Sequence, residues 1–65
     1  MATAKEIKAA RTALDETQSD FGKRFLVDQA TIHRWETKGP PRVGLAAVEI
    51  DRRLAELKNG ARKKN

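Results

Sequence analysis

One short stretch of the chain gathers the side chains that could recognise another molecule. Residues 29–38 are QATIHRWETK, and at about 100° per residue a helix here places its polar or small residues within one sector of about 140°. These residues are Gln29, Ala30, His33, Arg34 and Thr37. Glutamine can bind adenine and arginine can bind guanine through paired hydrogen bonds, and the major groove of DNA admits one α-helix. The pattern therefore favours a helix that contacts base edges.

Each of these side chains also has a plainer interpretation as part of a solvated helix surface. Ala30 could contact the methyl group of thymine, and His33 could donate a hydrogen bond to a base or a phosphate. Trp35 could stack on unpaired bases, but it falls on the opposite side of the helix with Ile32, which favours the core. Because no Ser, Cys or carboxylate is placed to form a catalytic pair with His33, an enzyme is not predicted.

Length and composition exclude several classes of protein. The 65 residues make one domain. The chain has no cysteine and one histidine, so a disulfide framework is excluded, and no metal or cofactor is predicted. No apolar run approaches the roughly 20 residues of a membrane span, and the N-terminus lacks the apolar core of a signal peptide. We therefore expect a cytoplasmic protein with no membrane partner.

The net charge of +5 comes from 14 basic and 9 acidic residues, a balance that favours a polyanionic partner such as nucleic acid. Its distribution limits that inference. Residues 1–57 hold 10 bases and 9 acids and contribute only +1, whereas residues 58–65 contribute the remaining +4. Residues 61–65 are expected to form a flexible basic tail. The prediction of DNA binding therefore depends on the arrangement of residues 29–38 and not on the net charge.

Helices must position residues 29–38, since no stretch alternates apolar and polar residues over the length of a strand. A capping box that begins at Thr3 predicts a helix to about residue 14. A cap signal at Thr17 predicts a second helix to about residue 25 or 26. Asp28 is the N-cap candidate of the third helix, which Gly39 ends.

A fourth helix is predicted to start near residue 41 or 42 and to end near residue 58 or 59, with Gly60 as its stop. A continuous apolar stripe runs along about four turns of this helix. Its members are Val43, Ala47, Ile50, Leu54 and Leu57. Leu45 and Val48 form a second, shorter stripe. This long helix is expected to cover the first and third helices with part of its length.

Residues 17–36 resemble the helix-turn-helix segment of the phage repressor and Cro-type (XRE) family. The segment is TQSDFGKRFLVDQATIHRWE, and the likeness rests on the Thr-Gln pair at its start, the apolar pattern through it and the Trp-Glu pair at its end. Arg11 extends the likeness backward into the first helix. The resemblance implies an all-α, compact four- to five-helix lambda-repressor-like DNA-binding domain over residues 1–60, with its helix-turn-helix at residues 17–38.

Two positions depart from the family's pattern. Gly22 stands where that family usually has Ala, and a glycine within a helix suggests the close approach of another helix. Leu26 stands at the family's turn glycine. That glycine often takes a positive φ, which is uncommon for leucine. Either the turn differs locally or Leu26 is strained.

The resemblance also assigns roles to single residues. Base contacts fall to Gln29, Ala30, His33 and Arg34. Contacts with DNA phosphates, which position the protein without specifying sequence, fall to Gln18, Thr37, Lys38 and Arg42. Gln18 can also brace Gln29, and Arg11 and Glu36 form a partly buried ion pair between the first and third helices. The alternative role for Lys38 and Arg42 is solubility alone.

The function implied is that of a sequence-specific, double-stranded DNA-binding transcriptional repressor, an autorepressor of a small operon in a phage or mobile element. Repressors of this kind commonly dimerise so that two recognition helices meet successive major grooves about 34 Å apart. We therefore expect a homodimer on an inverted-repeat operator and no small-molecule effector. The predicted dimer contact is the distal stripe of Ile50, Leu54 and Leu57, with packing inside the chain as the alternative.

A second class of function stays open. An antitoxin-like or adaptor module would use the C-terminal helix to bind another protein, with DNA binding secondary. The apolar distal stripe is the feature that could support it. Sensitivity of DNA binding to salt and to the loss of Arg34 would separate the two classes.

Overall fold

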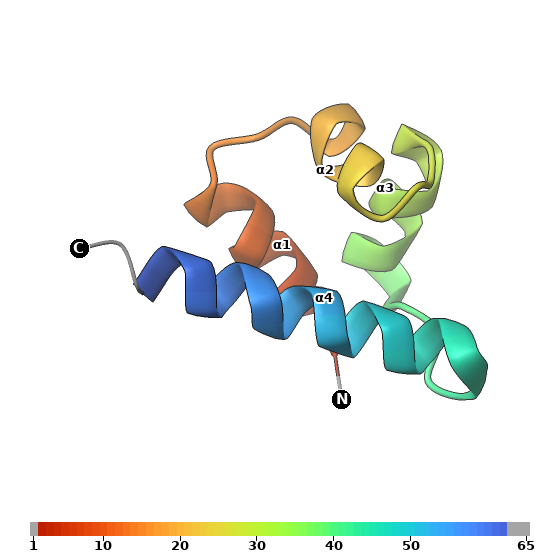
Figure 1. The fold of residues 1–65 in the computed structure, drawn as a ribbon. Coiled ribbons are helices and arrows are strands. Elements are labelled where there is room, and N and C mark those ends of the chain that lie inside the picture. The colour runs from red at the N-terminus through yellow and green to blue at the C-terminus, as the bar shows by residue number, and fades with distance from the viewer. Residues whose placement is uncertain (1, 63–65) are drawn as a thin grey trace.

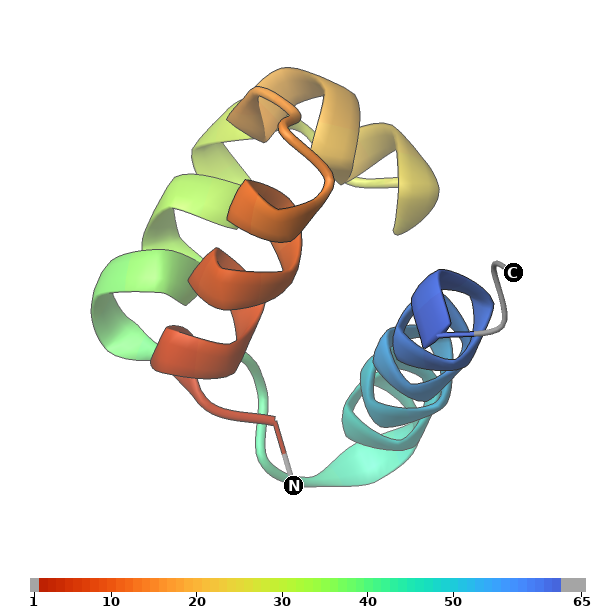
Figure 2. The same ribbon diagram turned by 90° about the vertical axis from the view of Figure 1, so that its left-hand side faces the viewer.

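The protein is all-helical. The computed structural model describes residues 2–62, with side chains through residue 59. This part of the chain holds no strand, and its helices are α1 (Ala4–Ala13), α2 (Gln18–Arg24), α3 (Gln29–Lys38) and α4 (Gly44–Arg62). Helices α1 and α3 lie side by side, α2 lies at one end of them, and α4 crosses α1 on the other side (Figures 1 and 2). No helix within residues 2–62 is both long and apolar enough to span a membrane.

The first three helices begin where side-chain caps place them. The Thr3 hydroxyl accepts from the Glu6 amide at 3.1 Å, and the Glu6 carboxylate accepts from the Thr3 amide at 3.2 Å, which confirms the capping box. Thr17 and Asp28 each accept from the amide three residues ahead, at 3.0 Å. These bonds satisfy amides that have no partner inside the helix. The predicted starts of all three helices are therefore confirmed.

Helix α2 ends at a left-handed residue that is not glycine. The Leu26 amide donates to the Lys23 carbonyl at 3.3 Å and the Val27 amide donates to the Gly22 carbonyl at 3.0 Å, the two bonds of a Schellman motif. The residue between helix and turn in this motif is left-handed, and Leu26 accordingly has φ of 60°. Of the two alternatives raised by the sequence, the strained leucine is the one observed. Helix α1 ends in the same way, with Asp15 at φ of 57°.

Gly22 makes room for the turn that follows its own helix. A Cβ on this residue would lie 2.6 Å from the Val27 carbonyl oxygen and 3.3 Å from Cγ1 of Ile32. The first distance is too short for any carbon–oxygen contact, so a side chain at residue 22 would displace the turn. The close approach is present, but the expected partner is corrected: the tightest contact is with the backbone of the turn, and α3 contributes only the more distant Ile32 side chain.

The core joins all the helices. Its fully buried members are Ile7, Phe21 and Ile32, one from each of the first three helices. Trp35 is only 7% exposed and packs edge-on against Phe25, with ring centroids 5.7 Å apart. Such an arrangement is favourable for aromatic pairs. The preference for a core tryptophan over a base-stacking one is confirmed.

Helix α4 corrects two predicted boundaries. It starts at Gly44 and not near residue 41, because Gly44 has φ of 89° and turns the chain there. Val43 consequently precedes the helix and is 83% exposed. The helix then continues through Gly60 to Arg62, since a glycine costs a helix about 1 kcal/mol but does not have to end it. Two residues of the predicted tail are thus helical, and residues 63–65 lie outside the described residues.

The predicted dimer contact is also corrected. Ile50 and Leu54 are each only 4% exposed and belong to the chain's own core, with Leu57 packed against it. They cover the layer formed by α1 and α3, so they offer no apolar surface to a second copy. The shorter stripe is the uncovered one: Leu45 is 88% exposed and Val48 is 63% exposed.

Candidate nucleic-acid interface

Helix α3 has one exposed side and one buried side, as its sequence pattern predicts. Ile32 and Trp35 are buried and Glu36 is mostly buried. The exposed side, called here the α3 face, consists of Gln29, Ala30, His33, Arg34, Thr37 and Lys38. Every residue predicted to contact bases lies on it. The structure thus places these side chains together in solvent, on a helix that the core holds from behind.

A buried ion pair joins the back of α3 to α1. Arg11 Nε lies 2.6 Å from Glu36 Oε2, and Arg11 Nη2 donates to Glu36 Oε1 at 3.2 Å. The two side chains are 20% and 6% exposed. Arg11 Nη1 also donates to the Glu16 carbonyl at 2.9 Å. The predicted pair is confirmed, and its arginine additionally fixes the loop between α1 and α2.

The ion pair keeps Glu36 charged although it is buried. Burial alone would raise the pKa of this carboxyl, but hydrogen bonds from Arg11 and Gln18 and the nearby positive charges outweigh it, so the pKa is lowered. The pKa of Arg11 is raised, chiefly by its hydrogen bond to Glu36. Both groups are therefore ionised at neutral pH, and Glu36 acts only as a hydrogen-bond acceptor.

Gln18 links this ion pair to the α3 face. Its Nε2 donates to Glu36 Oε1 at 3.1 Å, and its Oε1 accepts from Gln29 Nε2 at 2.8 Å. The same Nε2 lies 3.5 Å from Nδ1 of His33. The expected bracing of Gln29 by Gln18 is confirmed. The link from Gln18 back to Glu36 was missed, because nothing in residue spacing shows that the two side chains meet.

The remaining polar groups of the α3 face differ in their availability. The Thr37 hydroxyl bonds back to its own helix, to the carbonyls of His33 at 3.0 Å and Arg34 at 3.2 Å. A phosphate contact from Thr37 would have to break that bond. Within the described chain, the exposed cations Arg34, Lys38 and Arg42 have no ion-pair partner.

Several arginines elsewhere are paired with neighbouring acids. Arg24 is paired with Glu16, and Arg52 and Arg53 are paired with Glu49. Among the described residues, Lys5, Lys8 and Lys23 are also exposed and without an ion-pair partner. Although residues 1–57 carry almost no net charge, Arg34, Lys38 and Arg42 provide free positive charge at α3 and just after it. This is the local charge that a polyanion requires.

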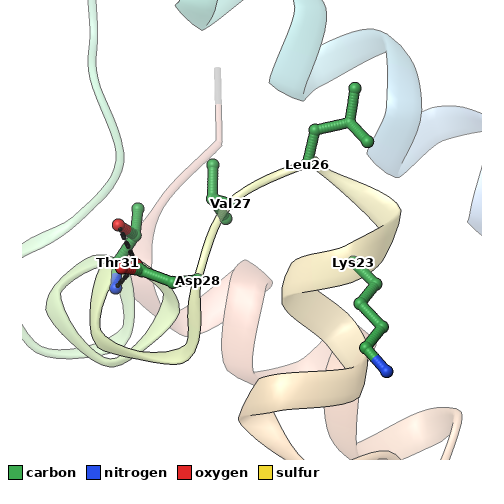
Figure 3. Close-up of a pocket in the computed structure, with 5 residues that line it drawn as sticks. All are labelled: Lys23, Leu26, Val27, Asp28 and Thr31. Carbon is green, nitrogen blue, oxygen red and sulfur yellow. Dashed lines mark hydrogen bonds between the residues drawn. The ribbon is translucent and has the colours of Figure 1, made fainter.

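A shallow open hollow lies beside the turn between α2 and α3 (Figure 3). Two of its polar side chains bond to each other, since the Thr31 hydroxyl donates to Asp28 Oδ1 at 2.6 Å, and the third, Lys23, is exposed. That hydrogen bond is the main cause of the lowered pKa of Asp28. Leu26 and Val27 form its apolar side. The hollow therefore helps to define how α3 starts and presents few free polar groups.

Comparison with known proteins adds no relative. Neither protein-family models, nor curated proteins, nor solved structures gave a match to this chain. Among residues 2–62, no group of three or more His, Cys, Asp or Glu side chains could hold a metal ion. The interface is therefore argued from its own geometry and charge.

Proposed function

We propose that this protein is a sequence-specific transcriptional repressor that binds double-stranded DNA. In this proposal α2, the turn at Leu26 and α3 form a helix-turn-helix of the lambda-repressor and Cro type, and α3 enters the major groove. The observation that carries the proposal is the α3 face, where Gln29 and Arg34 project into solvent from a helix anchored in the core. These two side chains can distinguish adenine and guanine from other bases.

Phosphate contacts fit the residues around the α3 face. Lys38 and Arg42 are exposed and unpaired at the end of α3 and beyond it, so they can reach the backbone on that side of the groove. Gln18 stands at the N-terminus of α2, where amide groups and the helix dipole favour an anion. Because such contacts release counterions, affinity for DNA should fall steeply as salt increases.

DNase protection of the DNA upstream of the protein's own gene tests this function. A protected inverted repeat is expected, as is its loss in Arg34→Ala, because one guanine contact contributes about 1–3 kcal/mol. Lys58→Ala is the matched control, since Lys58 is equally charged and lies towards the C-terminal end of α4, away from the α3 face and from Leu45 and Val48. Equal protection by the two variants would refute the assignment of Arg34, and no protected sequence would refute the function.

The biological setting belongs to the same proposal. A repressor of this size, acting in the bacterial cytoplasm through its own concentration, suits autorepression of a small operon in a phage or mobile element. An inverted repeat would require a homodimer, in which α3 of each copy occupies one half-site. The uncovered apolar residues Val43, Leu45 and Val48 are the surface that supports self-association.

The same surface favours one other candidate function. An antitoxin-like or adaptor module would use Leu45 and Val48 to bind a different protein, with DNA binding secondary. Single apolar residues on a surface are common, but a group of this kind often marks an interaction site. The two candidates differ in what covers the surface, a second copy or an unrelated partner.

A further inference from the structure

A continuous chain of hydrogen bonds runs from the core to the α3 face. It passes from Arg11 to Glu36 at 2.6 Å, from Gln18 to Glu36 at 3.1 Å and from Gln29 to Gln18 at 2.8 Å. The Glu36 side chain in this series is only 6% exposed, whereas Gln29 at its outer end is exposed. The first member is charged and the last is a residue of the proposed DNA contact.

The chemistry of each group determines which partner donates and which accepts in every one of these hydrogen bonds. An ionised carboxylate can only accept, so Gln18 must turn its NH2 group toward Glu36. The Gln18 oxygen then faces Gln29 and accepts a hydrogen bond, so Gln29 must donate from its own NH2 group. His33 Nδ1, 3.5 Å from Gln18 Nε2, is an acceptor in neutral histidine protonated at Nε2, which agrees with this orientation. A glutamine amide otherwise has two orientations of similar shape.

We propose that Glu36, acting through Gln18, fixes the amide orientation of Gln29 and thereby the base that Gln29 selects. Gln29 is left with its oxygen and one N–H free. This is the acceptor and donor combination that adenine requires, since adenine offers N6–H as donor and N7 as acceptor. With the amide reversed, the oxygen would face Gln18 and only N–H groups would point outward. Glu36 and Gln18 are thus positioning residues.

This inference rests on the proposed function only for its effect on base choice; the amide orientation can be measured without DNA. Gln18 and Gln29 are the only glutamines in the chain, so selective ¹⁵N labelling of glutamine gives two side-chain amide signals in NMR. We expect both signals to lie away from those of free glutamine. In Gln18→Ala the remaining Gln29 signal should move toward the free value. In Glu36→Gln, which adds a third glutamine signal from residue 36, the signals of Gln18 and Gln29 should both move.

Glu16→Gln is the matched control, because it neutralises the acid of another ion pair, with Arg24, that does not lead to the α3 face. The variant adds a third glutamine signal from residue 16, but the signals of Gln18 and Gln29 should not move. Gln18→Ala leaves the Arg11–Glu36 ion pair in place, so it tests the chain of bonds even where Glu36→Gln lowers stability. Glutamine signals at the free value in the wild-type protein would overturn the inference.

Binding to operators altered at one base pair then measures the consequence. At the position that Gln29 contacts, the wild-type protein should prefer A·T over G·C by roughly 5- to 150-fold. Gln18→Ala and Glu36→Gln should reduce that preference without reducing the preference at the position that Arg34 contacts. An unchanged preference in both variants would overturn the inference and leave the proposed function standing. If the glutamine signals lie away from those of free glutamine but the protein binds no DNA, the proposed function is overturned and the inferred amide orientation still stands.

Discussion

The turn residue Leu26 has a strained backbone and a side chain that gains little from burial. Its backbone is left-handed, at φ of 60°, and its side chain is 83% exposed. A left-handed residue with a Cβ is strained by about 1–2 kcal/mol, and an exposed side chain recovers little of that through burial. The Schellman motif nonetheless requires this conformation, since the Val27 amide reaches back to the Gly22 carbonyl.

Leu26→Gly should therefore stabilise the protein by about 0.5–1 kcal/mol, because relief of the strain exceeds the added entropy of the unfolded chain. The free energy of unfolding from urea denaturation measures the change. Ala9→Gly is the control, since Ala9 is also exposed but lies inside α1, and this variant should lose about 1 kcal/mol. A loss of stability in both variants would show that the strain at Leu26 is small.

The helices illustrate which features a sequence determines locally. The starts of α1, α2 and α3 follow from caps that act over three residues, so they could be predicted. The two sides of α3 follow from helical periodicity and could be predicted as well. The start of α4 depends on the positive φ of Gly44, which glycine permits but does not require. No pattern within α4 itself contains that information.

Between elements, the ion pair of Arg11 and Glu36 is the strongest polar link of α1 to α3. Removing one partner of a buried pair commonly costs about 3–5 kcal/mol, so Glu36→Ala should lower the free energy of unfolding by an amount of that order. Because folding lowers the pKa of Glu36 below its ordinary value of 4.5, the carboxylate contributes stability above that pH. The contribution is lost as the pH falls through the folded-state pKa.

The stability of the wild-type protein should consequently fall between neutral pH and about pH 3 by more than that of Glu36→Gln, whose side chain does not titrate. Urea denaturation at several pH values measures both curves. Glu56→Gln is the control for the loss of a surface carboxylate, because Glu56 is 66% exposed, and its free energy of unfolding at neutral pH should stay close to that of the wild type. Parallel curves for the wild type and Glu36→Gln would contradict the role of this ion pair.

At the scale of the whole molecule, the sequence pattern could not determine whether the distal part of the long apolar stripe of α4 faces the core or a second copy, and the predicted contact with a second copy was wrong. Ile50 and Leu54 could equally have met α1 or a second copy, because an amphipathic helix covers either surface with the same residues. The structure directs them inward. Leu45 and Val48 then point away from the core, and Glu49 and Arg52 lie on the same side one turn further along.

This outward side is suited to a contact between two identical copies. A two-fold axis brings each residue of one copy against a different residue of the other, so the apolar pair can bury itself while Glu49 and Arg52 offer charges of both signs. Sedimentation equilibrium should show association above 7.3 kDa as concentration rises. Leu45→Glu should shift the protein toward monomer with little change in melting temperature, because the side chain is 88% exposed in the single chain.

Ala9→Glu places the same charge on the exposed surface of α1 and should leave association unchanged, so it is the control for charge alone. If the homodimer serves an inverted repeat, Leu45→Glu should also weaken binding to the full operator while leaving binding to a single half-site unaffected. A wild-type protein that stays at 7.3 kDa at all concentrations, on and off DNA, would exclude the homodimer. The uncovered residues Leu45 and Val48 would then favour the adaptor alternative, in which another protein covers them.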